Sequence, residues 1–240
     1  YPCLCVVGQY IDALKSGKYD LSRTALMITQ TGGGCRASNY MSLIRKAVAA
    51  EFPDVPVVSI NFSGLEKDSS FKIGAKLFLK LAYSIFYGDC IMWCYNQTKP
   101  YETTVGAADA ARESAVEFVT GKFAKGGYAN YKKIVKQIIS VFAAVERSGR
   151  KKVKVGIVVK YSRLGNNRLE SFLLSEDCEP VVPALMDFVL YCIVNGINDH
   201  AYYGHNKNSV FAYKFVYKLV YGMQKKIIRL FKDNGVFEPI

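Results

Sequence analysis

The sequence is poor in histidine, tryptophan and proline, with two, one and seven of these residues among 240. It also has no low-complexity tract and no repeat of solenoid period. Half of the residues are hydrophobic and 22% are charged, a balance that can bury a substantial core. Together these features exclude a disordered chain, a collagen-like chain and a small disulfide scaffold.

The scarcity of histidine limits the available chemistry. A cysteine nucleophile needs a nearby base, and His200 and His205 are the only candidates for a histidine base. They flank an Ala-Tyr-Tyr-Gly stretch far along the chain from the cysteines near the amino terminus, and we expect both to lie in a surface loop. A Cys-His hydrolase is therefore disfavoured.

The number of cysteines is odd, which argues against a disulfide framework and for a reducing, cytoplasmic compartment. Cys90 and Cys94 share one face of an apolar helical stretch, so we expect them to be buried rather than to bind zinc. We assign structural roles to Cys178 and Cys192 as well. The seven cysteines are Cys3, Cys5, Cys35, Cys90, Cys94, Cys178 and Cys192.

Positive charge is in excess, with 32 Lys or Arg against 20 Asp or Glu and a formal net charge of +12. The basic residues are spread along the chain, so solvated helix faces are the favoured interpretation and a nucleic-acid partner is disfavoured. Residues 71–95 are the one candidate membrane span, but Lys72, Lys76 and Lys80 would form a polar stripe on that helix. We therefore expect no membrane partner.

Two stretches follow a strand, turn, helix, strand order. In the first, a strand over residues 24–30 precedes a glycine turn, a helix and a strand at 55–61. The second has strands at 152–160 and 179–182, with helices at 168–175 and 183–193. Helical periodicity marks residues 70–97, 106–121, 128–147 and a long final helix from 207 that ends at the 233–235 turn. This order predicts an α/β fold with two Rossmann-like lobes and parallel sheets, residues 1–150 and 151–240, with added helices between and after them.

The glycine turn is the first candidate site. Gly32, Gly33 and Gly34 precede a helix, so backbone N–H groups could converge there on an anion. Cys35 and Arg36 stand where a phosphate loop has Lys and Ser or Thr, and the spacing is not that of a dinucleotide fingerprint, so ATP and NAD are disfavoured. Cys35 falls in the first helical turn, where the field favours a thiolate; tight packing of a small residue is the alternative.

Three stretches carry a family resemblance: residues 3–9 (CLCVVGQ), residues 29–40 (TQTGGGCRASNY) and residues 164–170 (LGNNRLE). With these motifs the chain resembles the 2-hydroxyacyl-CoA dehydratase family, and more closely a module of the large CoA-substrate-specific enzyme activases. The likeness continues through residues 183–193 to the ending at residues 236–239 (VFEP), so it covers most of the chain.

The resemblance implies a [4Fe-4S] cluster held by three cysteines between two lobes. Cys3 and Cys35 match the two early ligands; Cys3 is preferred to Cys5, although either could reach, and the third ligand would lie beyond Ile240. Gly32, Gly33, Gly34 and Arg36 would line the cofactor. The implied partners are an ATP-hydrolysing activator and an acyl-CoA, and a homodimer is allowed.

The resemblance also defines two geometric expectations and one alternative. Cys35 should face the cleft between lobes, with residues 163–167 opposite it, and the Asn pair at 166–167 should cap the helix that starts near Arg168. Relatives carry extra residues after Val158, so residues between Val158 and Val159 could be missing. The alternative function is a non-catalytic scaffold or interaction domain whose cluster has been lost.

Overall fold

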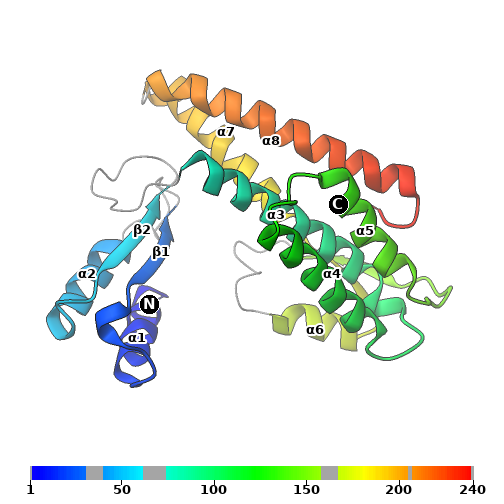
Figure 1. The fold of residues 1–240 in the computed structure, drawn as a ribbon, viewed down its shortest axis with the longest axis horizontal. Coiled ribbons are helices and arrows are strands. Elements are labelled where there is room, and N and C mark those ends of the chain that lie inside the picture. The colour runs from blue at the N-terminus through cyan, green and yellow to red at the C-terminus, as the bar shows by residue number, and fades with distance from the viewer. Residues whose placement is uncertain (1, 31–39, 62–73, 158–166, 205–206, 239–240) are drawn as a thin grey trace. The chain divides into compact units, whose positions relative to one another are not determined.

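The computed structural model describes residues 2–30, 40–61, 74–157, 167–204 and 207–238 (Figure 1). It is mostly helical, at 69%, with two parallel sheets of two strands each, which is compatible with a mixed α/β class. The chain divides into two compact units, Tyr1–Gly74 and Ala75–Ile240, here called unit 1 and unit 2. This division differs from the expected boundary at residues 150 and 151, for a reason given by the core of unit 2.

Unit 1 contains the first expected strand, helix, strand order. The two strands pair in parallel from Leu26↔Val57 to Gln30↔Asn61. Pro2 is the first residue of the first helix, where its missing N–H costs nothing and its fixed φ suits the helix. The elements are α1 (Pro2–Lys15), η1 (Leu21–Arg23), β1 (Leu26–Gln30), α2 (Tyr40–Glu51) and β2 (Val57–Asn61).

The two helices of unit 1 share one small core with the strands. Its buried members come from α1, β1, α2 and the turn before β2: Leu14, Leu26, Ile44, Val48 and Val55. At the carboxyl ends of the helices the Lys15 ammonium lies 2.5 Å from a Glu51 carboxylate oxygen. Because α1 and α2 pack together and their carboxyl ends meet, the two helices run in the same sense along the sheet.

Unit 2 is a layer of long helices with the second parallel sheet. The strands at 153–156 and 178–181 pair from Val153↔Cys178 to Gly156↔Val181. The expected long helices are confirmed, and the last ends at Asn234 with Gly235 at φ +70°, the left-handed cap that the sequence predicted. The elements are α3 (Ala75–Asn96), η3 (Lys99–Tyr101), α4 (Ala107–Ala124), α5 (Tyr131–Ala143), β3 (Val153–Gly156), α6 (Asn167–Ser175), β4 (Cys178–Val181), α7 (Leu185–Tyr203) and α8 (Lys207–Asn234).

The core of unit 2 explains where the chain divides. Trp93 on α3 packs edge-on against Phe231 on α8, with ring centroids 5.3 Å apart, and Phe142 on α5 is fully buried in the same cluster. α3 therefore shares its apolar face with α5, α7 and α8, so helices expected to wrap the first lobe belong to one core with the carboxyl-terminal elements.

Buried polar contacts fix the ends of these helices. The two Asp89 carboxylate oxygens accept the backbone N–H groups of Leu185 and Met186, each at 2.9 Å, and so cap α7 from the middle of α3. Gln97 exchanges two hydrogen bonds with the Glu238 backbone, donating at 2.8 Å and accepting at 2.7 Å. Together with the buried Phe237, this pair ties the end of the described chain to α3.

One helix in the described part of the chain, Lys76–Tyr101, is long and apolar enough to cross a membrane by length and composition alone. In its most apolar window 44% of the residues are buried inside the structure. Lys76 is exposed and Lys80 is half-buried, whereas Lys72 lies outside the described residues.

Candidate functional site

Cys3 is the only expected site residue that the structure describes. Gly32, Gly33, Gly34, Cys35 and Arg36 all fall within residues 31–39, outside the described part. The same is true of residues 163–166, so the expected cleft and the capping Asn pair stay predictions. Asn167 is itself the first residue of α6, one position earlier than the expected start.

Cys3 lies in the first turn of α1, which begins at Pro2. Its thiol is free and half-buried, and the neighbouring Cys5 is free and exposed. The first turn of a helix has backbone N–H groups without intrahelical partners, and Cys3 lies beside them.

The direction of α1 sets which end of unit 1 carries Cys3. The carboxyl end of α1 meets that of α2 through Lys15 and Glu51, so Cys3 lies towards the same end of the helical layer as Tyr40, the first residue of α2. The Tyr10 hydroxyl, two turns further along α1, donates to the Met27 carbonyl at 2.7 Å and ties this helix to β1.

The segment that connects β1 to α2 ends at Tyr40, the first residue of α2. β1 ends at Gln30 and β2 ends at Asn61, and because the strands are parallel both ends lie at one edge of the sheet. Ligands of α/β proteins collect at such an edge. Cys35 is five residues before Tyr40 in the chain, so the segment that contains it joins this edge to α2.

The remaining described cysteines all lie in unit 2. Cys90 and Cys94 are fully buried in α3, as expected, and burial raises the pKa of both thiols. The Cys178 thiol donates to the Glu176 carbonyl at 3.4 Å, and Cys192 is half-buried. Among the described residues no three His, Cys, Asp or Glu side chains gather as a metal site.

The position of one histidine differs from the sequence-based expectation. His200 lies in α7 and is half-buried, so it is not a loop residue; the helix continues to Tyr203 before the left-handed Gly204 ends it. His205 lies outside the described residues.

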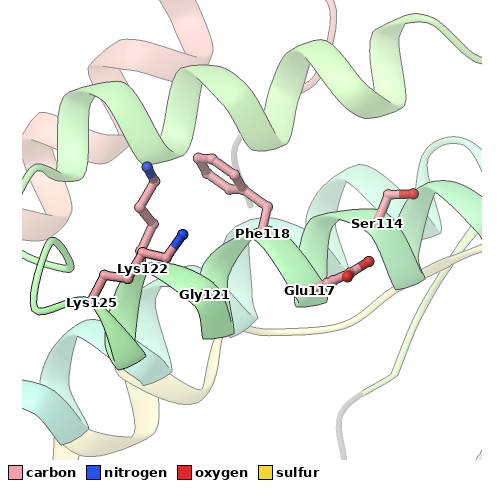
Figure 2. Close-up of a pocket in the computed structure, with 6 residues that line it drawn as sticks. All are labelled: Ser114, Glu117, Phe118, Gly121, Lys122 and Lys125. Atoms are coloured by element: carbon pink, nitrogen blue, oxygen red, sulfur yellow. The ribbon is translucent and has the colours of Figure 1, made fainter.

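A cavity of about 360 Å³ runs along α4, which the sequence did not indicate (Figure 2). Its lining comes from α4 and the C-cap residue of that helix, Lys125. The Lys122 ammonium lies 5.1 Å from the centre of the Phe118 ring. A hollow lined by one helix offers no converging groups for catalysis. The lining residues are Ser114, Glu117, Phe118, Gly121, Lys122 and Lys125.

Comparison with known proteins adds no relative, since no family model, no curated protein and no solved structure matches the chain. The candidate site is therefore argued from its own residues.

Proposed function

We propose that this chain is an iron-sulfur redox module similar to the 2-hydroxyacyl-CoA dehydratase component, with Cys3 and Cys35 as two ligands of a [4Fe-4S] cluster. When bound, such a cluster takes up and passes on single electrons at low potential. The chain's own contribution is to hold the two thiolates at one end of unit 1, and a third ligand would come from beyond Ile240.

The orientation of α1 is the observation that carries this proposal. Cys3 lies towards the same end of unit 1 as the amino end of α2, and Cys35 is five residues from that end along the chain. Five residues span at most about 18 Å when extended, so the proposal requires Cys35 to lie within that distance of Tyr40, at this end of the sheet. The donors also suit the cofactor, because iron-sulfur clusters are held by cysteine thiolates.

The strands of unit 1 support the finer proposal of a Rossmann-like lobe. β1 and β2 each carry apolar residues on both faces, Leu26 and Met27 in β1 and Val57 and Val58 in β2, as parallel sheets covered by helices on both sides do. The helices α1 and α2 share a core with Leu26 and Ile28, whereas Met27, between them, is 57% exposed. In a Rossmann-like lobe, further elements would cover Met27 and extend the sheet of β1 and β2.

The proposal includes the partners that the resemblance implies. They are an ATP-hydrolysing activator as electron donor and an acyl-CoA as acceptor, in the cytoplasm. The surplus of cationic residues suits the phosphates of CoA without defining where they would bind.

Iron and sulfide analysis tests the proposal. The chain, together with whatever sequence follows Ile240 in its natural protein, is purified anaerobically, and iron, sulfide and visible absorbance are measured. We expect stoichiometric iron and sulfide with broad visible absorbance, and loss of most iron in Cys3→Ala and in Cys35→Ala. Cys178→Ala is the matched control, because this thiol is half-buried in unit 2 and its carbonyl partner is local.

Each result has a distinct meaning. Wild-type iron content in both Cys3→Ala and Cys35→Ala would end the ligand assignment. Iron lost in Cys5→Ala but retained in Cys3→Ala would transfer the role to the neighbouring thiol. A colourless protein without iron or sulfide would favour the scaffold alternative.

A further inference from the structure

Positive charge gathers on one face of α8, the longest helix of unit 2. The helix holds seven Lys or Arg residues and one Asp. Its buried positions Val220, Gln224, Ile227 and Phe231 follow the spacing of a single helical face. Six cationic side chains are exposed elsewhere on the helix: Lys214, Lys218, Lys225, Lys226, Arg229 and Lys232.

Large aromatic side chains are exposed beside these cations. Phe211 is 81% exposed and Phe215 is 63% exposed. Each lies three residues before a lysine, Lys214 and Lys218 respectively, which places ring and ammonium group on neighbouring positions of the helix surface. Tyr202 and Tyr203, 80% and 72% exposed, end the neighbouring helix α7, which packs against α8 (Figure 1). We call the six cations and these four rings the α7–α8 face.

The form of this face restricts what can bind it. A helix of 28 residues is about 42 Å long and presents a convex surface, so it cannot enclose a small molecule. A second copy of the same face would oppose six cations with six more, which electrostatics disfavours. The binding partner is therefore an extended anionic surface that also accepts apolar rings.

The predominance of lysine over arginine on this face favours a lipid surface over a protein as the binding partner. Lysine is depleted in protein interfaces and arginine is enriched, whereas five of the six cations here are lysines. Helices that lie on membranes combine Phe, Trp or Leu, which enter the acyl boundary, with Lys near the headgroup phosphates. Single-stranded nucleic acid binds in cationic grooves rather than on a convex helix.

We propose that the α7–α8 face binds the anionic surface of a phospholipid membrane, with Phe211 and Phe215 entering the interface and the lysines lying near the headgroup phosphates. This binding is peripheral and needs no spanning segment. It reverses the sequence-based expectation of no membrane partner, which rested on the lysine stripe of residues 71–95. It does not depend on the proposed cluster.

Vesicle flotation tests the proposal with the whole chain. We expect binding to vesicles of equal parts phosphatidylglycerol and phosphatidylcholine, and none to phosphatidylcholine alone. The variant K214Q/K218Q/K225Q should bind on the order of 100-fold more weakly, because each lysine near an anionic surface adds a similar increment. The variant F211S/F215S should lose on the order of 10-fold or more, since two rings no longer enter the interface.

The control removes the same charge from another face. Lys132, Lys133 and Lys136 are exposed on α5, and K132Q/K133Q/K136Q should bind vesicles as the unaltered chain does. An equal loss in this control would show a net-charge effect and overturn the proposal. So would the absence of binding to anionic vesicles, or binding of an oligouridylate through the same lysines without vesicle binding.

Discussion

Substitution of the buried Asp89 should lower the free energy of unfolding of unit 2, because its side chain caps α7. Its side chain is 2% exposed, and both carboxylate oxygens accept N–H groups from the first turn of α7. In Asp89→Ala both donors lose their acceptor, the Met186 N–H at a buried position and the Leu185 N–H at a partly buried one. Each unsatisfied buried N–H costs about 1 to 3 kcal/mol, so for the two donors we expect the free energy of unfolding to fall by about 2 to 6 kcal/mol. Asp89→Asn keeps one acceptor oxygen, and we expect a loss of about 1 to 2 kcal/mol.

The chain contains its own probe for this measurement. Trp93 is the only tryptophan and is buried in the core of unit 2 against Phe231. Urea unfolding followed by tryptophan fluorescence therefore reports unit 2 and not unit 1. Glu113→Ala, which removes an exposed carboxylate from α4, is the control and should leave the midpoint unchanged.

The capping argument is tested by the order of stability among the variants. The account requires Asp89→Ala to be the least stable, Asp89→Asn intermediate and Glu113→Ala equal to the unaltered chain. A loss below about 0.5 kcal/mol for Asp89→Ala would refute the capping argument, because surface substitutions without such a role fall in that range.

Three further predictions concern other parts of the chain. Burial raises the pKa of Glu102, but hydrogen bonds from the Lys99 ammonium and from the Gly106 and Ala108 amides outweigh burial and hold the pKa below its ordinary 4.5. The ionised carboxylate therefore stabilises unit 2 above about pH 4.5, and this contribution is lost as the pH falls through the pKa of the folded state. In Glu102→Gln the stability of unit 2, measured by tryptophan fluorescence, should fall less steeply with acid. Phe237→Ala should destabilise unit 2 by about 3 to 4 kcal/mol, with a fall in urea midpoint, because a buried ring is removed. In native protein a thiol reagent should modify exposed Cys5 first and reach buried Cys94 only after urea is added, as peptide mass spectrometry would show.

The elements of the fold could be predicted because their signals are local. The periodicity of residues 128–147 predicted α5, and the Asp-Asn-Gly turn at 233–235 predicted the end of α8. Apolar runs bounded by turn residues likewise predicted the strands β1 and β2.

The division of the chain could not be predicted because it depends on contacts distant in sequence. α3 packs with α8 through Trp93 and Phe231, which are more than a hundred residues apart, and no local pattern records that pairing. The Asp89 cap on α7 and the exposed Phe211 beside the lysines of α8 depend in the same way on how the helices pack.

The candidate site could be predicted in part. The motif containing Cys35 is a local signal, and the structure adds the direction of α1, which the Lys15 to Glu51 contact indicates. Cys3 and Cys35 are far apart in the sequence, and Cys3 belongs to α1. The sequence alone therefore could not predict where Cys3 lies, because its position depends on the packing of α1 against α2.

The distance between Cys3 and Cys35 tests the central claim most directly. Cluster thiolates lie about 6 to 7 Å apart, so a short rigid bifunctional maleimide should join the two thiols in the native Cys5→Ala variant, and not in urea, as peptide mass spectrometry would show. Efficient single labelling of both Cys3 and Cys35 in the native chain, without any cross-link between them, would contradict the account.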